Sequence, residues 1–113
     1  MDNIESVTIK KMTADDVDKI IAIESEAYGE HHWSKDSFLN EIHNELARYY
    51  TLFTSSGEIA GYAGTWHILD EAHITNIAIS PNYRRRGYGE ALLKRVIDDC
   101  YTEMIKYITL EVR

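Results

Sequence analysis

The 113-residue sequence predicts one α/β domain with a mixed sheet of the α+β type, in the order β-α-α-β-β-β-α-β. Two observations predict this class. Stretches of alternating apolar and polar residues are interrupted by stretches in which apolar residues recur every three or four positions, as in amphipathic helices. In addition, the last helix joins two strand-like stretches, and such a crossover connection makes those two strands parallel.

The first third of the chain predicts a strand followed by two helices. Residues 7–12 alternate, and Thr13 with Asp16 three positions later is a capping pattern for a helix that Gly29 ends. Ser34 is the expected cap of the second helix. The apolar face of that helix is expected to consist of Phe38, Leu39, Ile42 and Leu46.

The middle of the chain predicts three strands in succession. Residues 49–54 and 59–68 are rich in β-forming side chains and flank a tight turn, so they predict a hairpin. Gly61 and Gly64 in the second of these strands indicate a bend or a close approach of another group to the backbone. A short connection then leads to residues 73–80, which we expect to pair antiparallel with the preceding strand.

The last helix and strand contain the single cysteine. The helix is expected to pack on the sheet through Leu92, Leu93, Val96, Ile97, Cys100 and Met104. Cys100 lies on this apolar stripe, which favours a small buried side chain over a nucleophile, and one cysteine cannot form an internal disulfide. In the last strand, residues 106–112, alternation places Ile108, Leu110 and Val112 on one side and Tyr107, Thr109 and Glu111 on the other.

Composition and charge exclude several classes of function. The formal net charge of −7 argues against broad binding to a nucleic-acid backbone. The chain has no apolar run long enough to cross a membrane, and its acidic N-terminus does not resemble a signal peptide, so a cytoplasmic location is expected. His31 and His32 are adjacent and therefore lack the helical spacing of paired metal ligands, so no metal site is expected.

The stretch of residues 76–93 predicts a strand, a basic loop with two glycines, and a helix. The start of such a helix offers backbone N–H groups and a positive dipole end to an anion. Gly87 and Gly89 allow a ligand to approach the backbone, and Arg84–Arg86 add positive charge. The physical pattern indicates a diphosphate site, with a solvated basic turn as the alternative.

The spacing Arg84-x-x-Gly87-x-Gly89 resembles the pyrophosphate-loop motif of the GNAT N-acetyltransferases. Together with residues 76–81 before it and Leu110-Glu111-Val112-Arg113 after it, the chain resembles the RimI branch, the ribosomal-protein alanine N-acetyltransferases. The resemblance implies the GNAT acyl-CoA N-acyltransferase fold, truncated after the fifth strand, and acetyl-CoA as co-substrate. The cofactor-binding residues that it implies are Ile77, Ala78, Ile79, Arg84, Arg85, Arg86, Gly87, Tyr88, Gly89 and Glu90.

The resemblance also implies a base and an acceptor. Glu111 matches the general base of RimI-like enzymes, where a half-buried position against aromatic side chains is expected; a surface strand residue paired with a cation is the alternative. An N-terminal α-amine, with a reference pKa of about 7.7–8.0, is partly deprotonated at neutral pH, whereas lysine at about 10.4 is not. A protein or peptide N-terminus, such as that of a ribosomal protein, is therefore the expected acceptor, acetylated by direct attack of its amine in a ternary complex.

Other expectations follow from the same resemblance. Trp33 is a candidate substrate-binding residue at the acceptor groove, with a core anchor as the alternative. Family members continue beyond the position of Arg113 with a helix that carries a tyrosine general acid and a final hairpin. We therefore expect a C-terminally incomplete domain spanning residues 1–113, with a homodimer covering the exposed edge of the last strand. A non-catalytic acetyl-CoA-binding module and an enzyme acting on a small amine are the alternative functions.

Overall fold

The computed structural model describes residues 6–111 and confirms the predicted order of strands and helices. Three single-turn 3₁₀ helices, at Ala14–Asp16, Gly29–His31 and Pro81–Tyr83, lie at the ends of longer elements. The strands and longer helices are β1 (Thr8–Lys11), α1 (Val17–Tyr28), α2 (Lys35–Ile42), β2 (Ala47–Phe53), β3 (Ile59–Ile68), β4 (Glu71–Ile79), α3 (Tyr88–Thr102) and β5 (Tyr107–Leu110).

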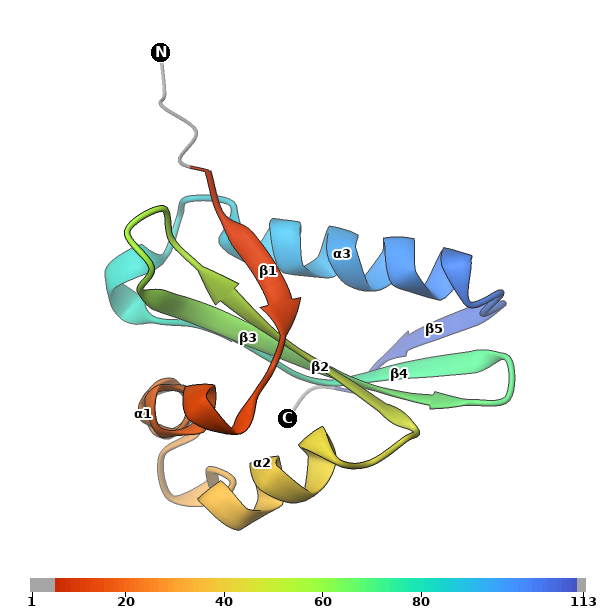
Figure 1. The fold of residues 1–113 in the computed structure, drawn as a ribbon, viewed down its shortest axis with the longest axis horizontal. Coiled ribbons are helices and arrows are strands. Elements are labelled where there is room, and N and C mark those ends of the chain that lie inside the picture. The colour runs from red at the N-terminus through yellow and green to blue at the C-terminus, as the bar shows by residue number, and fades with distance from the viewer. Residues whose placement is uncertain (1–5, 112–113) are drawn as a thin grey trace.

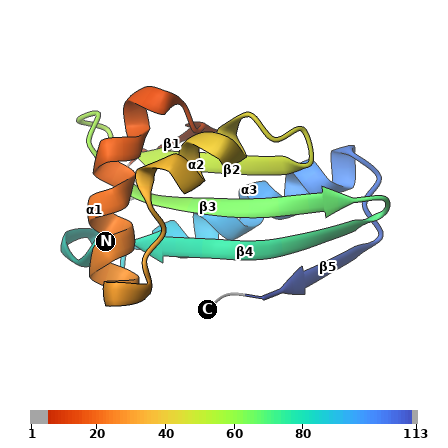
Figure 2. The same ribbon diagram turned by 90° about the horizontal axis from the view of Figure 1, so that it is seen from below.

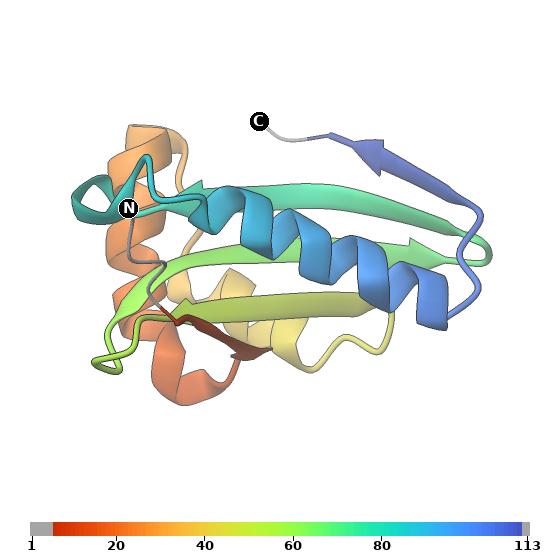
Figure 3. The same ribbon diagram turned by 90° about the horizontal axis from the view of Figure 1, so that it is seen from above.

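The five strands form one sheet in their chain order, β1-β2-β3-β4-β5. The first four strands pair antiparallel, and β5 pairs parallel to β4, as the crossover through α3 requires. Helices α1 and α2 cover one face of the sheet and α3 lies across the other (Figures 1 and 2). Seen from the side of α3, this helix runs over the middle strands, and β5 lies at one edge of the sheet (Figure 3).

Each face of the sheet has its own hydrophobic core. The core under α3 is built from buried side chains of β2, β3, β4 and α3, among them Leu52, Ala63, Ile74, Leu92 and Val96. The core under α1 and α2 includes Val17, Ile20, Phe38, Tyr49 and Tyr62. Burial of such side chains stabilises the fold by about 1.5–3 kcal/mol each.

Three details of the sequence prediction are wrong. Helix α2 ends at Ile42, so Leu46 is exposed in the turn before β2, where its N–H donates to Asn44 Oδ1 at 3.0 Å. The buried line through Leu92, Val96 and Cys100 packs on the sheet, whereas Leu93 and Ile97 of α3 and Met104, which follows the end of α3 at Thr102, are exposed. Strand β4 begins at Glu71, two residues earlier than predicted, and Val112 lies outside the described residues.

The predicted cap of α2 is confirmed, because Ser34 Oγ accepts a hydrogen bond from the N–H of Ser37 at 3.1 Å. The predicted cap at Thr13 opens the 3₁₀ turn before α1, where the Thr13 N–H donates to Asp16 Oδ2 at 3.0 Å. Within residues 6–111, none of the helices has the length and apolar character that a membrane span requires.

Candidate functional site

The loop between β4 and α3 leaves backbone N–H groups at the start of α3 available to a ligand. Helix α3 begins at Tyr88, and its first backbone bond joins the Ala91 N–H to the Gly87 oxygen at 3.0 Å. The N–H groups of Gly89 and Glu90 therefore have no acceptor within this described helix. Gly87 has a φ of 81°, in the left-handed region, and a Cβ atom there would meet nothing within 4 Å. The space above the helix start is thus open.

Aromatic side chains attach this loop to the body of the domain. The ring of Tyr83 stacks on that of Tyr88 at 6.3 Å between centroids, and the Arg86 guanidinium lies 5.4 Å from the Tyr83 centroid. The Tyr83 hydroxyl donates a hydrogen bond to Glu58 in the turn between β2 and β3. The loop is therefore held from two sides while its basic side chains stay at the surface.

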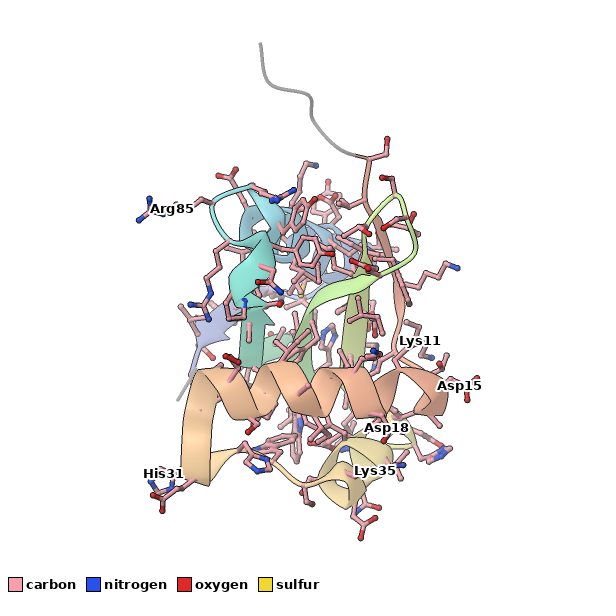
Figure 4. The ribbon with its side chains drawn as sticks, turned by 90° about the vertical axis from the view of Figure 1, so that its left-hand side faces the viewer. Lys11, Asp15, Asp18, His31, Lys35 and Arg85 are labelled. Atoms are coloured by element: carbon pink, nitrogen blue, oxygen red, sulfur yellow. The ribbon has the colours of Figure 1, made fainter. Side chains whose placement is uncertain are left out.

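The three consecutive arginines of the loop are all exposed, and their side chains point in different directions. Arg84 Nε donates to the carbonyl oxygen of Ile79 at 3.2 Å, whereas Arg85 projects away from the domain (Figure 4). Arg85 itself has a φ of 65°, which is uncommon for a residue with a side chain. These charges and the positive end of the α3 dipole favour an anion at the helix start, so the residues present fit a diphosphate group.

Strand β5 covers only the first half of the β4 edge that leads into this loop. The pairing of the two strands ends at Ile74 and Leu110, with one further bond from the Glu111 N–H to the Ile74 oxygen at 2.8 Å. All four residues of β5 are paired in this way, so the edge of β4 from Thr75 to Ile79 has no described strand beside it (Figure 2). This unpaired edge of β4, called the β4–β5 opening, runs from the end of β5 toward the start of α3.

The carbonyl groups along this opening are not all available to a ligand. The Ile77 oxygen accepts a hydrogen bond from the Tyr28 hydroxyl at 3.4 Å, and the Ile79 oxygen accepts one from Arg84. A ligand that pairs with these carbonyls must displace both side chains. The role of Tyr28 could not be read from the sequence, because it depends on the packing of the end of α1 against β4.

A bulge in β4 changes the direction of the side chains in the opening. Gly64 of β3 pairs with Asn76 of β4, and the next β3 residue, Thr65, pairs with Ile74. Within the described ladder, Thr75 therefore has no partner on β3. Ile74 belongs to the core under α3, and after the extra residue Ile77 and Ile79 also pack on that core. Ala78 is buried in the other core. The predicted cofactor-binding segment thus contributes backbone and only partly buried side chains to the opening.

Glu111 lies directly after β5, at the β5 end of the opening. Its side chain is 60% exposed, so the expected half-buried position against aromatic groups is wrong. Its Oε2 lies 3.4 Å from Nδ1 of His73 on the neighbouring strand β4. The alternative of a surface residue paired with Lys or Arg is also not what is found, because the described partner is a histidine.

A hollow of about 250 Å³ adjoins Glu111 on the face of the sheet opposite to α3. Trp66 borders it and is fixed in place, since its Nε1 donates to Glu41 Oε2 of α2 at 2.7 Å. The lining residues are Trp66, Ile68, His73, Thr75 and Glu111. An acceptor group in this hollow would lie beside the Glu111 carboxylate and next to Trp66 and His73, which no motif in the sequence singles out.

Trp33, the predicted substrate-binding residue, lies elsewhere. Its ring is 5.4 Å from that of Phe38 and 6.2 Å from that of Tyr49, measured between centroids. The backbone N–H of Trp33 donates to Oε2 of the fully buried Glu24 at 2.7 Å. These contacts favour the core-anchor alternative, and a role of Trp33 in substrate binding stays a prediction.

Cys100 is buried, 1% exposed, as predicted. Burial raises the pKa of its thiol, which disfavours the thiolate that a nucleophile requires. Its Sγ lies 4.0 Å from Nε2 of His67. Among residues 6–111, no three His, Cys, Asp or Glu side chains are placed to hold a metal ion.

The part of the chain that matches a known protein family includes all of the site residues described above. Residues 15–113 match the acetyltransferase (GNAT) family. The ribosomal protein bS18-alanine N-acetyltransferases of Escherichia coli and of Salmonella typhimurium are each 36% identical over 94% of this chain, which covers 70% of each relative.

Solved structures agree with this assignment. The crystal structure of the ribosomal-protein-S18-alanine N-acetyltransferase from Escherichia coli superposes with a TM-score of 0.81 at 31% identity, over 93% of this chain and 66% of that chain. A PaiA N-acetyltransferase from Thermoplasma acidophilum, solved in complex with coenzyme A, shares the fold with a TM-score of 0.77 at 19% identity. No observation supports the homodimer expected at the edge of β5. The chain belongs to the GNAT acetyltransferase family, and its relatives within that family are ribosomal-protein alanine N-acetyltransferases.

Proposed function

We propose that this chain forms the cofactor-binding and base-carrying part of an acetyl-CoA-dependent N-acetyltransferase that modifies a protein N-terminal α-amine. The observation that carries the proposal is the position of Glu111 at one end of the unpaired β4 edge, with the start of α3, which suits an anion, beyond the other end. A cofactor that spans this edge would bring its reactive group toward Glu111. The relatives' names support the alanine N-terminus of a ribosomal protein as the acceptor class.

Bound acetyl-CoA would supply the acetyl thioester, and the chain's own groups would position it. The N–H groups of Gly89 and Glu90 and the arginines of the loop would hold the diphosphate. The strand edge of β4 beyond Ile74 would orient the remainder through backbone hydrogen bonds. A backbone N–H directed at the thioester oxygen stabilises the charge that develops there, by about 2.7–4 kcal/mol in comparable sites.

The acceptor nitrogen would bond to the acetyl carbon, and Glu111 would take up the proton that the amine loses. The C–S bond of the thioester would break, and coenzyme A would leave as a thiolate that takes a proton from solvent. The Glu111 carboxylate faces the hollow lined by Trp66, Ile68 and Thr75, which would receive the first residue of the acceptor. Trp66 and Ile68 give the hollow an apolar wall, which suits a small apolar residue such as alanine. The acceptor preference therefore rests on this hollow as well as on the relatives.

The test is an acetylation assay with the 113-residue chain, acetyl-CoA and a peptide that begins with alanine. We expect mass spectrometry to show one acetyl group on the N-terminal amine, and no acetylation of a polyamine or of a peptide whose N-terminus is blocked. Glu111→Gln should lower the rate by roughly 10²–10⁴-fold, as removal of a general base does. Glu26→Gln, at an exposed position on α1, is the matched control and should leave the rate unchanged.

Calorimetric titration with acetyl-CoA separates the alternatives. Binding without turnover on any amine would support a non-catalytic acetyl-CoA-binding module. Acetylation of a polyamine but not of the peptide would support an enzyme for small amines. Absence of binding would mean that these 113 residues do not form the cofactor site by themselves.

A further inference from the structure

His73 occupies a position between two carboxylates that the reaction proposed above does not use. Its Nδ1 lies 3.4 Å from Glu111 Oε2, and its Nε2 lies 3.3 Å from Glu71 Oε1. The side chain of His73 is only 22% exposed, whereas those of Glu71 and Glu111 are 50% and 60% exposed. The imidazole is therefore a partly enclosed bridge between two solvent-accessible carboxylates.

Sheet geometry fixes this row of groups. Glu71 and His73 are two residues apart on β4, and His73 pairs in parallel register with Thr109 of β5, which precedes Glu111 by two residues. All four side chains therefore point to one face of the sheet. Ala72 and Ile74, which alternate with them on β4, are buried under α3, so the row lies on the opposite face.

We propose that His73 is a positioning and proton-relay residue that returns Glu111 to its carboxylate form in each turnover; this inference rests on the base role proposed for Glu111. The proton that Glu111 takes from the acceptor amine passes from Oε2 to the unprotonated Nδ1 of His73. The proton on Nε2 leaves toward Glu71 and the solvent. One proton enters the row and one leaves it, so no other reactant is needed.

Each contact in the row suits this transfer. Glu71 Oε1, 3.3 Å from Nε2, favours the tautomer with the proton on Nε2, which leaves Nδ1 able to accept a proton. The Thr109 hydroxyl lies 2.7 Å from Nδ1 and can donate to that nitrogen before the transfer or accept from it afterwards. A separation of 3.4 Å in the absence of substrate is within the range that shortens in catalytic complexes.

The hollow explains why a relay is needed although Glu111 is exposed. Glu111 and His73 both line the hollow, and Glu71 does not. An acceptor seated in the hollow would cover Glu111 and block direct exchange with water. His73 offers a route from the covered carboxylate to Glu71, whose side chain remains in contact with solvent outside the hollow.

The first test compares the parent chain with His73→Ala, Glu111→Gln and the control His43→Ala, a histidine that follows α2 and does not line the hollow. We expect His73→Ala to lower kcat about 10-fold or more, with the KM for the peptide and acetyl-CoA binding changed less than 3-fold. Added imidazole should restore a substantial part of the lost rate in His73→Ala and have no effect in His43→Ala.

Full activity in His73→Ala together with inactive Glu111→Gln would overturn the relay and leave the proposed function intact. A loss in His73→Ala that appears as a raised KM and is not restored by imidazole would also overturn it, because that pattern describes a structural role. If His73→Ala does not fold, ¹⁵N NMR of the parent chain decides the question without turnover. The Nε2–H tautomer of His73 is expected, and the Nδ1–H tautomer would overturn the proposal, since Nδ1 could not accept a proton.

Discussion

The ring of Tyr49 on β2 lies directly against the backbone of Gly64 on β3. A Cβ atom at Gly64 would be 2.3 Å from Cε2 and 2.4 Å from Cζ of that ring. The two residues are paired in the antiparallel register, and the Tyr49 hydroxyl continues across to β4, where it donates to Asn76 Oδ1 at 3.1 Å. The predicted close approach at Gly64 is therefore made by a buried aromatic side chain.

Gly64→Ala should destabilise the domain by about 1–3 kcal/mol, because the added methyl group overpacks a site that the Tyr49 ring already fills. Urea denaturation of the variant and the parent measures this difference. In a Tyr49→Leu background the same substitution should cost less, since the ring atoms that clash are absent. Equal costs in the two backgrounds would show that the ring is not the cause.

Gly87→Ala should weaken acetyl-CoA binding, because Gly87 has a φ of 81° at the start of α3, where L-residues are disfavoured by about 1–2 kcal/mol. Relief of that strain would move the N–H groups that bind the anion. Gly57→Ala is the matched control: Gly57 has a φ of 89°, lies in the β2–β3 turn and also has open space for a methyl group. Both variants should lose similar stability, and calorimetry should detect weaker binding in Gly87→Ala alone.

His67 should make the domain less stable in mild acid. Burial lowers the pKa of His67 below its usual 6.5, although Glu103, 3.2 Å from its Nδ1, opposes the shift. The unfolded chain therefore binds a proton at His67 more readily than the folded chain, so the free energy of unfolding falls as the pH drops below about 6.5. Urea denaturation at pH 7.5 and 5.5 measures the fall, which should be smaller in His67→Gln. An equal fall in both proteins would contradict the role of His67.

At lower pH the Arg48–Glu103 ion pair makes a second acid-sensitive contribution to the free energy of unfolding. Partial burial opposes ionisation of Glu103, but the hydrogen bonds and charge of Arg48, together with His67, lower its pKa below the usual 4.5. A carboxyl group with a lowered pKa stabilises the fold above about pH 4.5, and this contribution is lost as the pH falls through the lowered value. Glu103→Gln should be less stable than the parent at pH 7 and approach it at pH 3.

Substitution of each tryptophan should distinguish a role in core packing from a role in binding the acceptor peptide. Trp33→Leu removes a ring packed on Phe38 and Tyr49 and should mainly lower stability, by roughly 1–3 kcal/mol. Trp66→Leu changes the wall of the hollow beside Glu111 and should mainly raise the KM for the acceptor peptide. Acetyl-CoA binding should stay within 2-fold in both. A raised peptide KM in Trp33→Leu alone would restore the substrate-binding role predicted for Trp33.

The sequence by itself determined the order of the elements, the mixed sheet and the loop before α3, because each depends on local patterns. Apolar alternation and helical spacing are set by neighbours a few residues apart, and the Arg84–Gly89 motif is contiguous. The same local patterns could not decide which stripe of α3 meets the sheet, and Leu93 and Ile97 were therefore wrongly expected in the core.

Only the tertiary structure decided what surrounds Glu111. Its neighbour His73 comes from another strand, and the hollow beside it depends on Trp66 of a third strand held by Glu41 of α2. The capping of the Ile77 carbonyl by Tyr28 likewise joins residues 49 positions apart in the chain. Such contacts are fixed by strand register and helix packing, which bring distant residues together and leave no periodic signal in the sequence.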